Sequence, residues 1–181
     1  CHLTSESPFI MQQIIQEISS GTLHLRSCLT PTEHPSALLI SNFVSLISAG
    51  PEKMARDLAK KSLLAKAKER TDHVRRVMEK VRNEGLWTTI EQVKQKLDEP
   101  MPMGYCSAGV VLACGEGVQG FKPGDRVASN GPHAEVVCVP KNLCAKIPDG
   151  VSTDQAAFTV LGSIAMQGVR LSKLNLGETA L

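Results

Sequence analysis

The spacing of hydrophobic and polar residues divides the chain into strand-like and helix-like segments. Between residues 22 and 44, short alternating or fully apolar runs are separated by prolines, which is typical of short β-strands joined by turns. Residues 51–98 change to a helical period, in which apolar residues recur at i, i+3, i+4 and i+7, as at Val74, Val77, Met78 and Val81. The pattern predicts two or three amphipathic helices, which end before the prolines at 100 and 102.

After Gly104 the chain returns to a β pattern. Four short, Val-rich runs are separated by Gly and Pro turns, and they lie at residues 109–114, 125–128, 133–139 and 143–147. Strands at this spacing predict a small barrel or sandwich. Residues 153–171 have a helical pattern again, and residues 178–181 have the character of another strand's beginning. The sequence therefore predicts an α+β fold with a helical segment inside a small β domain.

Composition and charge narrow the class of protein. The chain has 181 residues, of which 42% are hydrophobic and 21% charged, and no apolar run approaches the length of a membrane span. Residues 51–100 carry 13 basic and 9 acidic side chains, and this mixture indicates a solvated helical surface rather than a nucleic-acid site. We expect a soluble, cytoplasmic protein that binds neither nucleic acid nor a membrane.

The cysteines indicate a reducing compartment. None of them forms a C-x-x-C pair, and several lie in apolar, strand-like runs where free cysteine behaves as a small hydrophobic residue. No His pair has zinc-finger spacing. We therefore expect free thiols instead of a disulfide framework.

Residues 115–120 match the G-x-G-x-x-G pattern of dinucleotide-binding turns. In such sites the glycines open a helix whose N-terminus faces the pyrophosphate. Here Pro123 and Gly124 would end that helix at once, and Lys141 and Asn142 lie where an acidic residue would bind the ribose. The sequence predicts a turn between two strands at this position.

Several segments resemble the medium-chain dehydrogenases/reductases. Residues 120–127 (G-F-K-P-G-D-R-V) are similar to the G-x-x-x-G-D-R-V turn of that family, and residues 133–140 and 146–152 are similar to the segments that follow it. Residues 156–162 look like the family's link into its cofactor domain. The S-L-I-S-A-G sequence at residues 45–50 resembles a subgroup of bacterial oxidoreductases that carry a helical insertion.

The resemblance implies a GroES-like β-barrel on the substrate side of a cleft, followed by a Rossmann domain that binds NAD(P). It places the barrel at residues 11–50 and 101–152 and the helical insertion at residues 51–100. Residues 153–181 would form a linking helix and the start of a missing dinucleotide-binding domain, so that the fold is truncated. Residues 1–10 show no clear period and are interpreted as a tag or a disordered extension.

Mapped onto this chain, the resemblance implies that the catalytic zinc ligands of the family are replaced. The Cys of C-G-T-D falls on Ala49, the His of G-H-E-x-x-G falls on Tyr105, and the ligand of the linking helix falls on Leu161. The glutamate of the second motif is replaced by Cys106, and a single thiol does not provide three protein ligands. The four-cysteine structural zinc lobe is also missing. We expect no metal.

Without a metal, the candidate catalytic residues are Tyr105 and Cys106. The Tyr105 phenol would donate a hydrogen bond or a proton to a developing alkoxide or enolate, and the alternative is an amphipathic wall residue. Cys106 is either a nucleophile or, because no His is near in sequence, a buried thiol. Thr159 in the linking helix is the candidate cofactor contact. Pro51 occupies the position of the family's proton-relay hydroxyl, and His133 is interpreted as structural.

Two functions follow as hypotheses. The first is the substrate-side catalytic domain of a zinc-independent, NAD(P)-dependent oxidoreductase that acts on a carbonyl, alcohol or enoyl substrate, inactive as this fragment because cofactor contacts would lie beyond Leu181. The alternative is a non-catalytic, truncated barrel that serves as a binding or oligomerisation module. The apolar residues 156–169 predict self-association, as a homodimer for example, through the interdomain face.

Overall fold

A computed structural model describes residues 10–17, 20–60, 82, 100–173 and 177–178 of the chain. The chain divides into two compact units, one of residues 1–13, 27–47 and 104–181 and the other of residues 14–26 and 48–103. The helical face predicted at residues 74–81 lies outside the described residues, as do residues 1–9. No helix in the described ranges has the length and apolar character needed to cross a membrane.

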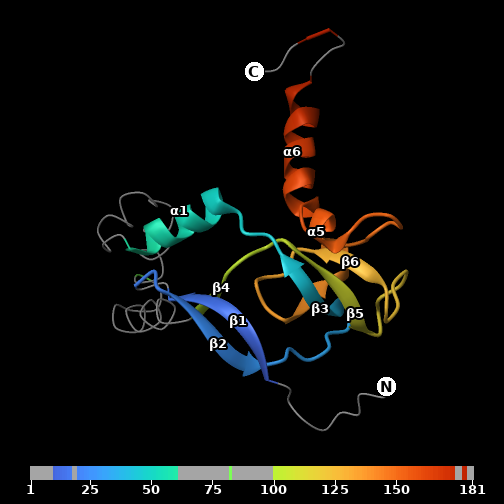
Figure 1. Cartoon of the computed structure of the whole chain (residues 1–181), viewed down its shortest axis with the longest axis horizontal. Helices are drawn as coiled ribbons and strands as arrows, with labels where there is room; N and C mark the ends of the chain where they lie inside the picture. Colours follow the sequence, from blue (N-terminus) through green and yellow to red (C-terminus); the bar gives the residue numbers. More distant parts are fainter. Residues whose placement is uncertain (1–9, 18–19, 61–81, 83–99, 174–176, 179–181) are drawn as a thin grey trace. The chain divides into compact units, whose positions relative to one another are not determined.

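The first unit is built on a five-stranded antiparallel sheet with the order β7-β3-β5-β6-β8 (Figure 1). Its strands are β3 (Ala37–Ser45), β5 (Ser107–Cys114), β6 (Arg126–Ser129), β7 (Val136–Pro140) and β8 (Cys144–Lys146), with a 3-10 turn at Lys141–Leu143 before the last. β3 pairs with both β5 and β7, so that Ile40 lies opposite Val111 on one side and Val137 on the other. Such cross-strand aliphatic neighbours stabilise one face of the sheet.

The core of this unit consists of alternate residues of those strands, as the period of two requires. Its buried cluster consists of the aliphatic side chains of Leu38, Ile40, Val111, Val127, Val137 and Val139, and the partly buried side chains of Cys114, Val118, Phe121, Ala134 and Cys144 pack against it. The Val-rich runs predicted as strands are therefore confirmed as strands. One prediction was wrong at its start, because β7 begins at Val136 and residues 133–135 precede it. There the buried side chain of His133 fixes a loop instead of extending the strand.

Two helices follow the sheet, where the pattern of residues 153–171 had predicted one. α5 (Thr153–Ala156) begins with a capping box, in which the side chains and backbone N–H groups of Ser152 and Gln155 hydrogen-bond reciprocally. Its small residues pack against Ala108 and Ala128 of the sheet. The N–H of Phe158 donates to the carbonyl of Gln155, three residues back, and this tighter turn separates α5 from α6 (Thr159–Ser172).

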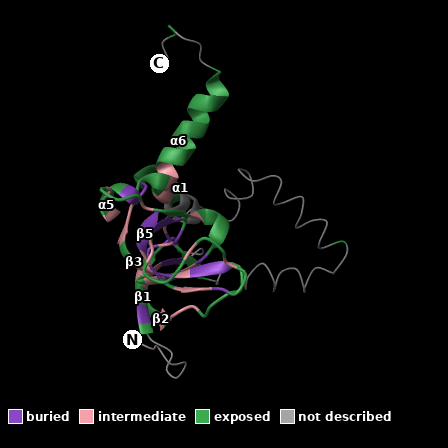
Figure 2. Ribbon diagram, turned by 90° about the vertical axis from the view of Figure 1, so that its right-hand side faces the viewer, coloured by how far each residue is buried: buried purple, intermediate pink, exposed green. Residues whose placement is uncertain are grey.

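α6 is exposed along almost its whole length (Figure 2). Large apolar side chains on it and just before it face solvent, namely Phe158, Ile164, Met166, Val169 and Leu171. Isolated exposed apolar residues are common on protein surfaces, but α6 and its N-cap carry five; by the helical period Ile164 and Leu171 share one side of the helix, and Phe158, Met166 and Val169 share the other. We call these five residues the α6 patch.

The second unit contains a helix and part of a three-stranded sheet with the order β2-β1-β4. The elements are β1 (Ile10–Glu17), β2 (Leu23–Leu29), α1 (Ala49–Lys60) and β4 (Pro100–Pro102). In β1, Glu17 lies opposite Pro100 and Ile15 lies opposite Pro102. The sequence predicts these prolines only as helix terminators, but in the structure they belong to β4, an edge strand of the described sheet, where a residue without an N–H group is tolerated.

Candidate functional site

Three strands of the first unit carry serine where they reach one end of the sheet. Ser45 is the last residue of β3, Ser107 the first of β5 and Ser129 the last of β6. The antiparallel register places Ser107 between the other two. The hydroxyl oxygens of Ser107 and Ser129 are 2.8 Å apart, and both side chains are buried. We call this end, with its three serines, the serine end of the sheet.

His133 joins the serine end from the loop that precedes β7. Its side chain is only 6% exposed, and its Nδ1 lies 2.9 Å from the Oγ of Ser45. On another side, the imidazole packs directly over Gly104, which has a φ of +89°. A Cβ atom at Gly104 would lie 2.6 Å from Cδ2 and from Nε2 of His133. The imidazole and the backbone conformation therefore both require glycine at position 104.

The candidate catalytic residues Tyr105 and Cys106 lie in the short segment between Gly104 and β5. Tyr105 is half-buried and Cys106 is completely buried. The carbonyl of Cys106 accepts a hydrogen bond of 2.9 Å from the N–H of Leu46, the residue that follows β3. The segment is thus attached to the serine end through its backbone, and the only tyrosine of the chain lies two residues before Ser107.

The other positions named from the sequence lie on the helices α1 and α6. Thr159 is the first residue of α6 and is exposed, and Leu161 in the same helix is half-buried. Ala49 begins α1 in the second unit, and Pro51 lies in the first turn of that helix. Within the described ranges, no three His, Cys, Asp or Glu side chains are placed to hold a metal ion. The absence of zinc stays a prediction.

The glycine-rich residues 115–120 do not fit a dinucleotide. They form a turn between β5 and β6, closed by a hydrogen bond of 2.9 Å from the N–H of Val118 to the carbonyl of Gly115. A Cβ atom at Gly115 would lie 2.0 Å from the carbonyl oxygen of His34, so glycine there is required by close packing of two backbone segments. The turn predicted from the sequence is confirmed, and this segment is not a phosphate site.

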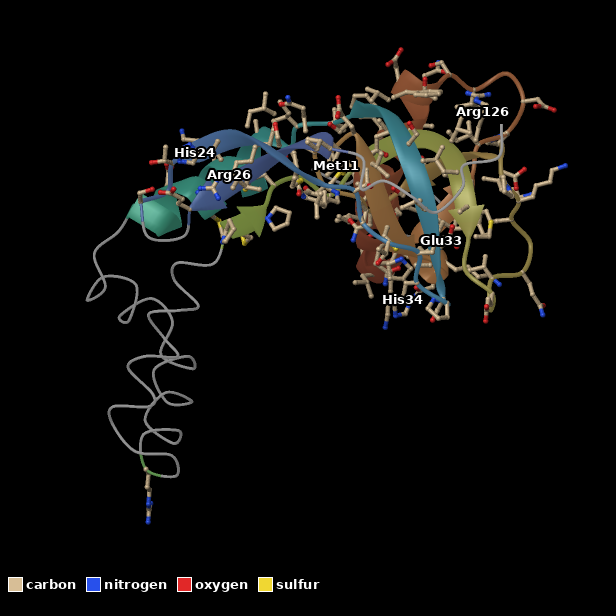
Figure 3. The ribbon with its side chains drawn as sticks, turned by 90° about the horizontal axis from the view of Figure 1, so that it is seen from below. Met11, His24, Arg26, Glu33, His34 and Arg126 are labelled. Atoms are coloured by element: carbon tan, nitrogen blue, oxygen red, sulfur yellow. The ribbon has the colours of Figure 1, made fainter. Side chains whose placement is uncertain are left out.

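The G-D-R-V turn holds the sheet together. The carboxylate of Asp125 accepts hydrogen bonds from the N–H of Lys122 at 2.9 Å and from Nζ of Lys146 in β8 at 2.8 Å. These two donors, the Lys146 ammonium first, lower the pKa of Asp125. The side chain of Arg126 donates a hydrogen bond to the carbonyl of Val151, which precedes α5. Figure 3 shows that the Arg126 side chain lies apart from those of Glu33 and His34. The most recognisable motif of the chain thus has a structural role.

Three thiols of the first unit have pKa values raised above that of a free thiol, which disfavours the nucleophilic thiolate. Burial is the main cause for Cys114, Cys138 and Cys144, and it raises the pKa of Cys144 to about 11. The Sγ of Cys144 lies 3.5 Å from the carbonyl oxygen of Pro140, to which the thiol donates. A thiol that stays protonated at neutral pH attacks substrates poorly. These cysteines therefore do not compete with the serine end as a reaction site.

Comparison with known proteins shows which domain part of the chain resembles. Residues 76–149 match the alcohol dehydrogenase GroES-like domain. An (R,R)-butanediol dehydrogenase of Bacillus subtilis is 31% identical over 108 residues, which covers 45% of this chain and 31% of that protein. The predicted resemblance to the medium-chain dehydrogenases/reductases is thereby confirmed.

Solved structures show the same fold. A quinone oxidoreductase from Coxiella burnetii aligns with a TM-score of 0.63 and 21% identity, over 94% of this chain and 47% of its own. A putative zinc-binding dehydrogenase from Sinorhizobium meliloti, bound to NADP, aligns with a TM-score of 0.64 and 17% identity, over 94% of this chain and 48% of its own. The present chain therefore spans about half the length of these solved relatives.

Proposed function

We propose that this chain supplies the substrate side of an NAD(P)-dependent oxidoreductase that acts on a carbonyl, alcohol or enoyl substrate without zinc. Support comes from the match to the alcohol dehydrogenase GroES-like domain and from the dehydrogenase among its relatives. The observation that carries the proposal is the position of Tyr105. By the family resemblance Tyr105 takes the position of the histidine ligand of zinc-dependent members, and it lies on a segment that leads into β5 and is anchored to the end of β3 through its backbone.

Tyr105 is proposed to stabilise the oxygen atom on which negative charge develops. A phenol donates one hydrogen bond to an alkoxide or enolate, and in a water-poor site such a donor contributes about 10²–10³-fold to the rate. The complete burial of Cys106 favours a packing role over the nucleophilic one. Thr159, exposed at the start of α6, remains the proposed contact for the cofactor.

NAD(P) supplies the hydride in this family, and the described residues contain no turn that fits its phosphates. We therefore propose that this chain alone is inactive and that the cofactor is held by a further domain. The free thiols at Cys28, Cys106, Cys114, Cys138 and Cys144 support a cytoplasmic location.

A second candidate function is supported by the α6 patch. An exposed apolar surface of this kind is typical of a contact with another domain or another chain. In the alternative proposal the truncated barrel is a non-catalytic binding or oligomerisation module that self-associates through α6. The two proposals differ in what Tyr105 does, since only the first requires its hydroxyl group.

The test uses the protein expressed from its native gene, with NADH and NADPH oxidation followed at 340 nm against aldehydes, enones and quinones. We expect turnover with one of these classes and a decrease of about 10²-fold or more in kcat for Tyr105→Phe, which removes only the hydroxyl. Thr32→Val removes an exposed hydroxyl from a loop and is the matched control. Equal kcat values for the two variants would exclude Tyr105 as the donor, and absence of turnover with all three substrate classes would favour the binding module.

A further inference from the structure

We propose that His133 is a positioning residue, which holds the segment carrying Tyr105 in its reactive place through simultaneous contacts with Ser45 and Gly104. The inference rests on the proposed function and deepens it, because it assigns a role in the same site to a residue that was interpreted as merely structural. His133 itself does not touch the substrate in this proposal. It acts through the backbone of the residue that precedes Tyr105.

The first contact is steric. Three atoms of the imidazole, Cδ2, Nε2 and Cε1, lie 2.6–2.7 Å from the position of a Cβ on Gly104, so the imidazole fills the space over that residue. Gly104 also has a left-handed φ of +89°, and the imidazole blocks movement of its backbone toward the loop before β7. The residue directly before Tyr105 is thus fixed on one side by His133.

The second contact orients the imidazole. Nδ1 of His133 and Oγ of Ser45 are 2.9 Å apart, although the two residues are 88 positions apart in the chain. Ser45 is itself fixed by its register with Ser107 at the start of β5. A phenylalanine would fill the same space over Gly104, but it would form no hydrogen bond to Ser45. Histidine provides both the packing and the hydrogen bond.

The other side of the Tyr105 segment is fixed independently of His133. The hydrogen bond of 2.9 Å from the N–H of Leu46 to the carbonyl of Cys106 joins the residue after Tyr105 to the end of β3. Gly104 and Cys106 are therefore both held, one by a side chain and one by a backbone hydrogen bond. Loss of His133 would free the first of these and leave the second, so the segment would be displaced without unfolding.

The chain offers a direct probe of this displacement, because Tyr105 is its only tyrosine. Labelling the 181-residue chain with 15N-tyrosine gives a single amide cross-peak in an NMR spectrum, and that peak reports on the backbone at Tyr105. The key variants are Ser45→Ala, which removes the hydrogen-bond partner, and Ser45→Thr, which keeps a hydroxyl. His133→Gln removes the imidazole, and His34→Gln makes the same change at an exposed histidine as a control.

We expect the cross-peak to shift or broaden in Ser45→Ala and His133→Gln, and to stay near its original position in Ser45→Thr and His34→Gln. In the active protein the first two variants should lose about 10–100-fold in kcat with little change in KM, which is the cost of a displaced catalytic group. A role in stability alone would lower the melting temperature without moving the resonance of the folded protein.

Two results would overturn the inference. In the first, the Tyr105 cross-peak of folded Ser45→Ala coincides with the cross-peaks of the original protein and of Ser45→Thr. This comparison tests the inference even when His133→Gln does not fold. In the second, His34→Gln produces an equal shift. Failure of the proposed function would give a different result. Tyr105→Phe would then keep full activity, while the Tyr105 cross-peak would still shift in Ser45→Ala.

Discussion

The fit of His133 against Gly104 can be tested by adding one methyl group. Gly104→Ala places a Cβ 2.6 Å from the imidazole at a residue with φ of +89°. Gly124→Ala makes the same change at a residue with φ of +91° and no atom within 4 Å of the new Cβ. The two variants therefore share the backbone strain and differ in the collision with His133.

The expected losses of folding stability follow from the backbone strain and from the collision with His133. A non-glycine residue in an unfavourable backbone region costs about 1–3 kcal/mol, which applies to both variants. In Gly104→Ala the imidazole must also move away from Ser45, and breaking a buried hydrogen bond adds about 1–3 kcal/mol. Since whole domains are stable by about 5–15 kcal/mol, the additional loss is a large fraction of the total.

Urea unfolding followed by circular dichroism measures both losses by linear extrapolation. We expect Gly104→Ala to lose about 1–3 kcal/mol more than Gly124→Ala. The double variant Gly104→Ala/His133→Ala should recover part of the difference, because the collision is removed and the two changes are coupled. Equal losses for the two glycine variants, or strict additivity in the double variant, would refute the contact between His133 and Gly104.

Three further predictions concern other parts of the chain. Lys146 lowers the pKa of Asp125, so the Asp125 carboxylate contributes stability above its unfolded pKa of about 3.9. This contribution is lost as the pH falls through the lower folded pKa. In Asp125→Asn the melting temperature should therefore change less between about pH 6 and pH 3 than in the original protein. With a pKa of about 11, Cys144 should resist iodoacetamide at pH 8 in the folded protein and react after unfolding in urea, as measured by mass spectrometry. Val169→Glu and Leu171→Glu should reduce self-association through the α6 patch, measured as a lower sedimentation coefficient; an unchanged coefficient would exclude this surface.

The strands of the first unit were predictable because their side chains alternate in a pattern that each segment carries locally. Val137 and Val139 face the core, and the Val-rich composition marks the strand without knowledge of its partners. β1 gave no such signal. Its sequence contains three glutamines, and Gln16, whose side chain donates to the carbonyl of Gly21, is buried. The strand instead pairs with β4, more than 80 residues later in the chain, and such a pairing is not encoded in its local pattern.

The candidate site was predictable only in part, for a similar reason. Family motifs identified Tyr105 and Cys106, because their positions follow from short, recognisable segments of sequence. The contact of His133 with Ser45 depends on the register of β3, β5 and β6, and no local pattern encodes an interaction across 88 positions. The one local sign was Gly104 itself, a glycine directly before the candidate tyrosine.

The resemblance maps a metal-ligand position onto Tyr105, and the contacts that hold the backbone there bear on this proposal. The segment around Tyr105 is held by the backbone hydrogen bond from Leu46 and by the packing of His133 over Gly104, and neither contact involves the side chain at position 105. Its geometry therefore does not depend on a metal ion, in contrast to structural zinc sites, whose folding requires the metal. A scaffold of this kind separates the stability of the site from its chemistry. Under the proposed function, the side chain at 105 could therefore be a ligand or a hydrogen-bond donor on the same backbone, and the positions that the proposal requires to stay unchanged are Ser45, Gly104 and His133.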